Sequence, residues 1–334
     1  ERDDPDAIDP AMITPDAFAA EWKWDGIRIQ AAANGAERRL YTRTGDDISH
    51  TFPDILDALD FDGAIDGELL VFRDGDLQDV APFNDLQQRL NRKTVTKKML
   101  EHYPAFIRAY DLLHLGDMDV RNETFAARRD RLNDLVDGLA GLASERIDLS
   151  PLVPFQHVED LVAARAAPPH SAIEGLMLKR WDSTYQSGRP KGPWFKWKRD
   201  PYLIDAVLLY AQRGHGKRSS FYSDYTFAVW TEIDGADTLV PVGKAYFGFT
   251  DEELKQIDKF VRDNTVERFG PVRSVRAEPD HGMVLEVAFE GLNRSTRHKS
   301  GVAMRFPRVN RLRWDKRPAE ADRLSTLEAL LPPD

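Results

Sequence analysis

The dipeptide Asp200-Pro201 divides this sequence into two parts that differ in their pattern of strand-like and helix-like segments. A residue that precedes proline is driven toward extended geometry, so the dipeptide predicts a hinge at residues 199–202. A chain of 334 residues is long enough for two hydrophobic cores, since domains run to roughly 100–200 residues. We therefore expect one domain at residues 1–200 and a second at residues 201–334.

The first part mixes strand-like and helix-like segments, and the second is dominated by short strands. In the first part we predict strands at residues 26–32, 39–42, 64–72 and 105–113, and helices at 84–102 and 121–139. In the second part we predict strands at residues 205–212, 225–231, 240–247 and 283–289. These strands are typical of a small β-barrel. One helix is predicted at residues 251–269, with Thr250 as N-cap and Glu253 as its capping-box partner.

Composition limits the protein class. The sequence has no cysteine, which excludes disulfides and tetracysteine zinc sites. It has neither a long apolar run nor a charged-then-apolar leader, so we expect a soluble cytoplasmic protein without membrane contact. The net charge is −10, but residues 294–317 hold nine basic residues against the single acid Asp315. A local field of that sign can hold phosphates whatever the global charge.

Three features are combined in the hexapeptide Lys23-Trp24-Asp25-Gly26-Ile27-Arg28. They are an amine, a glycine that permits a tight turn, and an arginine whose guanidinium can donate two hydrogen bonds to a phosphate. Gly26 lets the backbone turn beside a ligand, and Asp25 can orient the cationic head of Lys23. A lysine acts as nucleophile only when its amine loses its proton, which requires desolvation or nearby cations. An isolated match of this kind would more often be a surface lysine beside a turn.

Further short motifs follow in order. Each acid in Asp66-Gly67-Glu68 and in Glu174-Gly175-Leu176-Met177-Leu178-Lys179 would, if read alone, be a capping or turn residue; together they suggest a shell for Mg²⁺ and ribose. The alternation Trp194-Phe195-Lys196-Trp197-Lys198 places both lysines on one face of a strand, as an α-phosphate site requires. The last motif is Arg313-Trp314-Asp315-Lys316.

The order of these motifs, from about residue 21 to residue 330, resembles that of the ATP-dependent DNA ligases, within the covalent nucleotidyltransferases. The resemblance implies an α+β fold: a nucleotidyltransferase (adenylation) domain of antiparallel sheets with helices, then an oligonucleotide-binding (OB) barrel. It is closest to bacterial enzymes in which a helical DNA-binding domain precedes this core. Only 22 residues precede Lys23 here, so we expect a catalytic fragment or minimal enzyme that self-adenylates well and seals nicks poorly.

The resemblance assigns residue roles. It makes Lys23 the catalytic nucleophile, and it implies Mg²⁺, with Mn²⁺ as a possible substitute, held by Glu68 and Glu174. Tyr110 would stack on the purine, although its sequence context alone better suits a core tyrosine, and Glu21 would contact the adenine amino edge. The remaining residues expected to bind ATP are Arg28, Arg43, Glu68, Lys179, Lys196, Lys198, Arg313 and Lys316.

The implied activity is the sealing of nicks in double-stranded DNA, between 3′-hydroxyl and 5′-phosphate ends, by a monomer at the nucleoid. Expected backbone contacts to DNA are Arg89, Arg92, Lys93, Lys97, Lys98 and residues 294–311, although the helical group could equally be a plain charged surface. An RNA ligase or a capping-type guanylyltransferase would share the pattern of Lys23, Glu68, Glu174 and the two strand lysines. NAD⁺ is disfavoured as AMP donor, because the nicotinamide-binding domain and zinc cysteines of that ligase class are missing.

Overall fold

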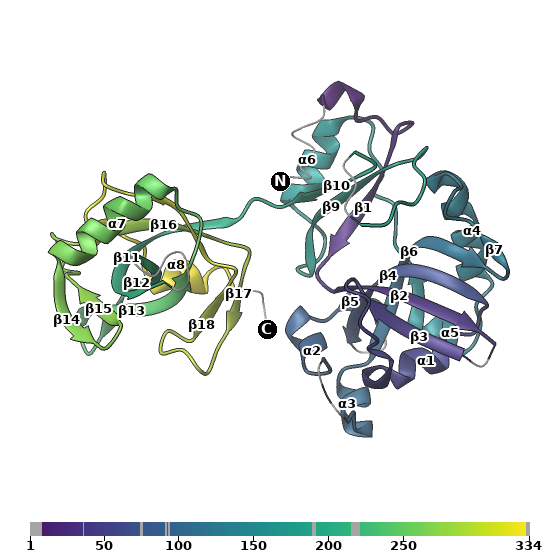
Figure 1. Ribbon diagram of the computed structural model, residues 1–334, viewed down its shortest axis with the longest axis horizontal. Helices are drawn as coiled ribbons and strands as arrows, with labels where there is room; N and C mark the ends of the chain where they lie inside the picture. Colours follow the sequence, from purple (N-terminus) through teal and green to yellow (C-terminus); the bar gives the residue numbers. More distant parts are fainter. Residues whose placement is uncertain are drawn as a thin grey trace. The chain divides into compact units, whose positions relative to one another are not determined.

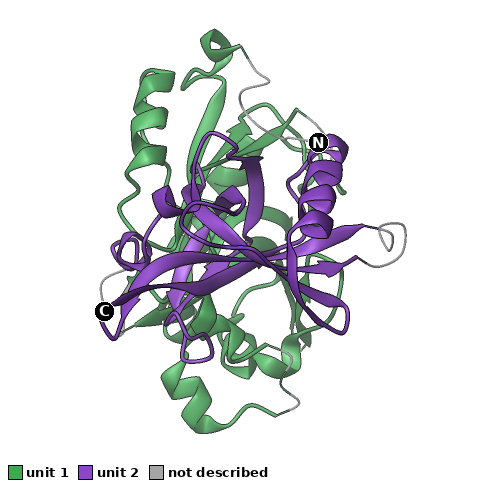
Figure 2. Ribbon diagram, turned by 90° about the vertical axis from the view of Figure 1, so that its left-hand side faces the viewer, with its two compact units in different colours: residues 1–199 green, residues 200–334 purple. Residues whose placement is uncertain are grey.

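The structure is a computed structural model that divides into two compact units, residues 1–199 and 200–334 (Figure 2). It describes residues 9–331 except residues 36, 74–75, 91, 93, 189–191 and 215–220. The limit between the units lies beside the predicted hinge at Asp200-Pro201. Each unit is described below by itself.

A large, mostly antiparallel sheet forms the core of unit 1 (Figure 1). Its strands are β2 (Ile27–Asn34), β3 (Glu37–Thr42), β4 (Gly63–Arg73), β5 (Asp76–Val80), β6 (Ala105–Leu115), β7 (Met118–Asp119) and β8 (Ile147–Leu149). The order is β3-β2-β4-β6-β7, with β5 paired to β4 and β8 paired in parallel to β6. The four strands predicted in the first part are confirmed as β2, β3, β4 and β6.

Helices cover the apolar face of this sheet, where Ile29, Leu69 and Ile107 lie in one buried cluster with Leu132. The helices of unit 1 are α1 (Pro53–Ala58), α2 (Phe83–Gln87), α3 (Lys97–His102), α4 (Phe125–Asp137), α5 (Leu142–Arg146) and α6 (Val158–Ala166). The helix predicted at residues 121–139 is α4, which begins later because the Thr124 side chain caps it by accepting from the Ala127 amide.

The single helix predicted at residues 84–102 is wrong. Two short helices, α2 and α3, lie at its ends, and the described residues between them are not helical. Thr96 is extended, and its hydroxyl accepts from the Met99 amide, so it starts a new helix. Threonine and valine at residues 94–96 disfavour helix because their branched side chains lose freedom there.

A second sheet in unit 1 has three strands, β1 (Phe18–Trp24), β9 (Ile173–Arg180) and β10 (Trp194–Lys198), in the order β1-β9-β10. Alternate residues divide between its faces. One face packs Ala20, Leu176, Leu178 and Trp197 into a separate core with helix α6 residue Leu161. The opposite face carries charged residues of the motifs, among them Glu21, Lys179 and Lys196.

Unit 2 is a barrel-like β-structure around one large core. Its strands are β11 (Tyr202–Arg213), β12 (Tyr222–Ile233), β13 (Ala236–Ala245), β14 (Thr265–Phe269), β15 (Val272–Val275), β16 (Val284–Phe289), β17 (Gly291–Arg294), β18 (Val302–Arg305) and β19 (Arg308–Leu312). The order is β13-β12-β11-β15-β14, with β16 bridging β11 and β19. The four strands predicted in the second part are confirmed as β11, β12, β13 and β16.

Two helices accompany the barrel, α7 (Asp251–Asp263) and α8 (Leu324–Glu328). The capping box of Thr250 and Glu253 is confirmed. The prediction of helix to residue 269 is wrong, because α7 ends at Asp263 and strand β14 follows. Thr265 and Val266 are β-branched and the segment pairs with β15, so sheet pairing outweighs the continued charge pattern.

Candidate functional site

A pocket of about 740 Å³ lies between the two sheets of unit 1. Its lining combines the polar face of the small sheet with the polar face of the large one. The predicted site residues that line it are Glu21, Lys23, Arg28, Arg43, Glu68, Tyr110, Lys179 and Lys196. The pocket therefore brings together residues that are far apart in the sequence.

Lys23 lies near the end of β1, where its Nζ donates to Glu174 Oε2 at 2.5 Å. The Nζ of Lys198 is 3.8 Å from the same oxygen. Both lysines pair in register with Gly175, which lies between them on β9. Gly175 has φ +150°, and a Cβ there would lie 2.2 Å from the Trp197 carbonyl oxygen. Only glycine lets the strands approach closely enough to bring the two amines to one carboxylate.

The turn after Lys23 is held by backbone contacts. The Asp25 amide donates to the Ala172 carbonyl, and a Cβ on Gly26 would lie 2.5 Å from the Leu69 carbonyl oxygen. A side chain at residue 26 would therefore push the turn between β1 and β2 away from β4. The expectation that Gly26 permits a tight approach of the backbone is consistent with this geometry.

Glu68 projects from β4 into the pocket, and its pKa is raised to about 8. Burial is the main cause; Lys23 lowers the pKa, while the charges of Glu174 and Asp25 raise it further. No group of three or more metal-ligating side chains occurs among the residues that the structure describes. Two carboxylates nevertheless fit Mg²⁺, which usually takes one or two from the protein and completes its shell with phosphates and water.

Glu21 lies on β1, two residues before Lys23, and is only 1% exposed. Its Oε2 accepts from Lys179 Nζ at 2.8 Å and from the Ser150 hydroxyl at 3.2 Å, and its Oε1 accepts from Arg129 Nη1 at 2.9 Å. Arg129 and Ser150 were not expected here. They come from helix α4 and the segment after β8, which carry no motif near these positions, so no sequence signal identified them.

The ammonium group of Lys179 also lies among aromatic rings. Its Nζ is 4.4 Å from the Tyr110 ring centroid, 4.3 Å from that of Trp194 and 5.0 Å from that of Phe125. Burial lowers the pKa of Lys179, while the Glu21 carboxylate opposes that shift. The cation therefore depends on the rings and the carboxylate for its stabilisation.

Tyr110 reaches the pocket through an irregularity in β6. Gly67 pairs with Ala109 and Asp66 pairs with Asp111, so Tyr110 is an extra residue opposite β4. Such a bulge redirects side chains. Tyr110 lines the pocket, whereas the neighbouring Ala109 belongs to the core. Burial, followed by the charge of Asp66, raises the pKa of Tyr110 well above its usual value, so its hydroxyl stays neutral.

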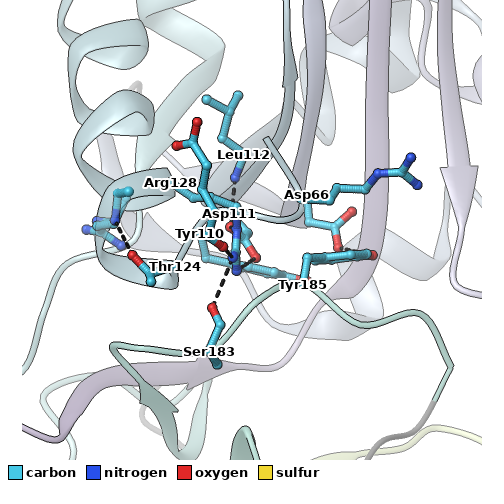
Figure 3. Close-up of polar contacts among 12 residues, drawn as sticks. Asp66, Tyr110, Asp111, Leu112, Thr124, Arg128, Ser183 and Tyr185 are labelled. Atoms are coloured by element: carbon cyan, nitrogen blue, oxygen red, sulfur yellow. Dashed lines mark hydrogen bonds and ion pairs between the residues drawn. The ribbon is translucent and has the colours of Figure 1, made fainter. Parts of the chain in front are cut away.

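Arg28 on β2 donates to Asp66 Oδ2 at 2.6 Å. Tyr185 donates to the same oxygen at 3.1 Å, and Figure 3 shows Tyr185 beside Asp66. Tyr185 lies after β9 and was not expected in the site, although it lines the pocket. Arg43 lines the pocket from the segment after β3 and is exposed. The two arginines thus differ: Arg28 is held against a buried carboxylate, and Arg43 faces solvent.

A buried ion pair supports this side of the pocket. Arg128 of helix α4 donates two bonds to Asp111, at 2.8 and 2.9 Å, and a third to the Ser183 carbonyl at 3.1 Å (Figure 3). Arg128 and Asp111 are fully buried. The pair therefore ties the strand of Tyr110 to the segment that carries Tyr185.

The predicted alternation in β10 matches the packing. Phe195 and Trp197 pack into the core with Leu176, whereas Lys196 lines the pocket and is exposed. Trp194 lies with the lysines on the pocket face and contacts Tyr110 edge to face, with ring centroids 6.3 Å apart.

Arg313 and Lys316 belong to unit 2 and are held there by carboxylates. Arg313 Nη1 donates to both oxygens of Asp205, at 3.0 and 3.1 Å, and Lys316 Nζ donates to Asp205 Oδ2 at 2.6 Å. Asp315 accepts three bonds from Arg313, at 2.9, 3.3 and 2.7 Å, and Glu286 lies 3.5 Å from Arg313 Nη1. These bonds hold the two cations of the last motif close together on the surface of the barrel.

The expected DNA contact by Arg89 is wrong. Its side chain is fully buried, donates to both oxygens of Asp54 and to the Thr51 and Tyr103 carbonyls, and stacks over Phe52. A charge in a sequence does not reveal whether the fold encloses it. Three other expected DNA contacts, Arg92, Lys97 and Lys98, are exposed, whereas Lys93 lies outside the described residues.

The basic stretch at residues 294–317 is partly neutralised. Arg311 donates to Glu286 at 2.9 Å, and Arg308 lies 3.5 Å from Glu290. Across the part of the chain that the structure describes, no helix is both long and apolar enough to cross a membrane.

Comparisons with known proteins agree with this geometry. Residues 6–198 match the family model of the "ATP dependent DNA ligase domain", and residues 218–316 match that of the "ATP dependent DNA ligase C terminal region". The chain is 36% identical to a "Probable DNA ligase" of Koribacter versatilis, over 96% of the chain and 58% of that protein. It is 37% identical to a "Probable DNA ligase" of Opitutus terrae, over 98% of the chain and 35% of that protein. The chain thus spans less than two thirds of these relatives.

Solved structures share the fold. One described as "Pmar-Lig_Pre." superposes with a TM-score of 0.67 at 18% identity, over 94% of this chain and 67% of that one. Another, described as "DNA binding with a minimal scaffold: Structure-function analysis of Lig E DNA ligases", superposes with a TM-score of 0.58 at 20% identity, over 90% and 94%. The predicted α+β class, with a nucleotidyltransferase domain followed by an OB-type domain, is confirmed. The family model covers more than half of the chain, which therefore belongs to the ATP-dependent DNA ligases.

Proposed function

We propose that this chain seals nicks in double-stranded DNA and uses ATP to form a covalent adenylate on Lys23. Use of ATP follows from the family. The observation that carries the proposal is the apposition of Lys23 Nζ and Glu174 Oε2, 2.5 Å apart, beside a pocket that Lys23 and Glu68 line. An amine nucleophile, a carboxylate that can take its proton, and cations for phosphate converge there.

In the first step, the ammonium group of Lys23 gives a proton to Glu174, and the lone pair of the resulting amine attacks the α-phosphorus of ATP. The nitrogen releases a second proton to solvent as the P–N bond forms. The bond between that phosphorus and the bridging oxygen breaks, and pyrophosphate leaves with the electron pair. Lys198 and Lys196 neutralise charge on the phosphate oxygens. Proton transfer by a positioned carboxylate contributes roughly 10²–10⁴-fold to such a step.

Glu68 would hold Mg²⁺, for which Mn²⁺ is a possible substitute, and Glu174 would join it as a ligand only while its carboxylate carries no proton. When bound, the ion supplies electrostatic stabilisation of the α-phosphate oxygens. Arg28 and Arg43 provide forked donors toward ribose and phosphate at the mouth of the pocket. Tyr110 provides the ring on which the adenine stacks, and Glu21 provides an acceptor for its amino group.

In the second step, the 5′-phosphate at a nick attacks the phosphorus of the lysyl adenylate, and the Lys23 nitrogen takes up a proton and leaves as an amine. In the third, the 3′-hydroxyl loses its proton to solvent and attacks the activated 5′-phosphorus, the new phosphodiester forms and AMP departs. Arg313 and Lys316 act only in the first step, where they bind the β- and γ-phosphates and orient pyrophosphate for departure. We further propose that the chain acts as a monomer at the nucleoid and contacts the DNA backbone, so that salt weakens its binding.

The test is the intact mass of the protein after incubation with ATP and Mg²⁺. We expect an added AMP that disappears when nicked duplex is supplied, with sealed DNA as product. Lys23→Ala should show no adduct, and Lys255→Ala, in helix α7 of unit 2, is the matched control that should still label. A wild-type protein that gains no AMP, or that keeps it in the presence of nicked DNA, contradicts the proposal.

A further inference from the structure

The floor of the pocket carries a carboxylate whose acceptor positions are almost filled. Glu21 is buried, and a carboxylate offers about four acceptor positions. Among the described residues, Lys179 and Ser150 occupy two positions on Oε2, and Arg129 occupies one on Oε1. One acceptor position is left, on Oε1. A buried acceptor of this kind is satisfied by a single ligand donor and is costly to leave empty.

The surroundings of Glu21 favour a flat ligand. Tyr110 and Trp194 line the same pocket, and their rings flank the ammonium of Lys179. A heteroaromatic ring stacked on Tyr110 would present its edge toward the floor. An edge that carries an N–H would satisfy Glu21, whereas one that carries a carbonyl oxygen would face a carboxylate.

Arg129 determines which acceptor position of the Glu21 carboxylate stays open. It is 4% exposed and does not itself line the pocket. Its guanidinium donates to Glu21, to the Ser150 carbonyl and, at 3.2 Å, to Asn133 Oδ1. A planar guanidinium group that donates to three partners has little freedom to rotate. The side chain of Glu21 therefore cannot rotate without breaking the bond to Arg129.

We infer that Arg129 is a positioning residue for nucleobase selection: it orients Glu21 so that one acceptor direction receives the exocyclic amino group of adenine. The inference rests on the proposed function, since it concerns the nucleotide that labels Lys23. It assigns selectivity to a residue of helix α4 that touches no substrate. Arginine is required because a lysine would keep the charge and lose the second arm, which reaches Ser150.

The experiment compares rates of self-labelling with ATP and with purine riboside triphosphate, which lacks the amino group. The variants are Arg129→Met and Arg129→Lys, and Arg131→Met is the matched control. Arg131 lies on the same helix, but it is 39% exposed and pairs with Glu123. The readout is the ratio of kcat/KM for the two nucleotides, together with the thermal unfolding midpoint of each variant.

Wild type should prefer ATP by about 10- to 100-fold, the usual scale for one hydrogen bond to a charged group. Arg129→Met should reduce kcat/KM for ATP until the ratio approaches one, with little change for purine riboside triphosphate. Arg129→Lys should give an intermediate ratio, and Arg131→Met the wild-type ratio. The analogue serves as an internal control for folding, because it needs the lysine and the phosphate site but no acceptor for an amino group.

Two results would overturn the inference. One is an equal loss with both nucleotides in Arg129→Met, which would mean that Arg129 supports the pocket in general. The other is a wild-type protein that labels equally well with both nucleotides, because Glu21 would then not read the base. Absence of labelling by any nucleotide in wild type would instead contradict the proposed function, so the two failures are distinguishable.

Discussion

In both units, lysines and arginines of the motifs are paired with carboxylates, but the carboxylates differ in where they lie. In unit 1 the partners of Lys23 and Lys179 are Glu174 and Glu21, and Glu21 lines the pocket itself. In unit 2 the common partner of Arg313 and Lys316 is Asp205, on the barrel strand β11. In the proposed mechanism, Glu174 takes part in the chemistry, whereas Asp205 only holds Arg313 and Lys316 in place.

The largest effect should follow from Glu174→Gln, which keeps the shape of the side chain but removes the proton acceptor from Lys23. We expect the rate of self-adenylation to fall by about 10²- to 10⁴-fold. Rapid-quench labelling with ATP at saturating Mg²⁺ measures it. Glu145→Gln, on helix α5, is the control. A loss below tenfold would show that this carboxylate is only a holding group, and the contrast between the units would disappear.

Disruption of the ion pair between Arg89 and Asp54 should affect the stability of the protein but not its activity, because neither residue lines the pocket. Arg89→Met leaves Asp54 without its main partner, which should lower the free energy of unfolding of unit 1 by about 3–5 kcal/mol. Urea unfolding measures this. The exposed control Lys98→Met should change it by less than about 0.5 kcal/mol. If Arg89→Met reduced the salt dependence of DNA binding as Lys98→Met does, Arg89 would be a DNA contact after all.

Asp205→Asn should affect only one step of the reaction. Loss of the carboxylate frees Arg313 and Lys316 from their common position, and misplacement of such groups costs up to about 10²-fold. We expect slower self-adenylation and a sealing rate within about twofold on nicks that are already adenylated, since no pyrophosphate leaves there. Asp205→Glu should restore part of the rate. Equal loss in both assays would indicate a defect of the barrel as a whole.

Glu68 gives a smaller, pH-dependent effect. Because its pKa is about 8, it carries a proton below pH 8 that a bound Mg²⁺ must displace. Affinity for Mg²⁺ should therefore rise by up to about tenfold per unit as pH increases toward 8 and then level off. Titration of Mg²⁺ by isothermal calorimetry tests this, with Glu68→Gln expected to be weak and independent of pH. A pH-independent wild type would contradict it.

The raised pKa of Glu68 also determines how the free energy of unfolding changes with pH. Without metal, the folded state keeps the Glu68 proton between its ordinary pKa of 4.5 and about 8, whereas the unfolded chain releases it. Folding is therefore favoured at the acid end of that window, and the free energy of unfolding should fall as pH rises through it. Glu68→Gln should remove this slope, which unfolding at a series of pH values can detect.

Local pattern predicted much of the fold and of the pocket. Alternation in Trp194–Lys198 predicted that Lys196 and Trp197 lie on opposite faces of the strand, because strand geometry has a period of two; Lys196 lines the pocket and Trp197 lies in the core. Arg129 and Tyr185 could not be predicted, because both come from segments without a motif: Arg129 contacts Glu21, and Tyr185 lines the pocket. Arg89 was misassigned for the complementary reason: burial depends on tertiary packing around Phe52, which local sequence does not encode.

The bulge at Tyr110 has a consequence for how this family can vary. Many substitutions in β6 would change the size of a side chain and leave its direction intact. Deletion of a single residue between Ala109 and Leu112 would instead remove the bulge and restore regular pairing of β6 with β4. Tyr110 would then turn toward the interior, and Asp111 would be displaced from Arg128. Among homologues, this stretch should therefore be constant in length even where its composition drifts, while insertions accumulate in the surface segments.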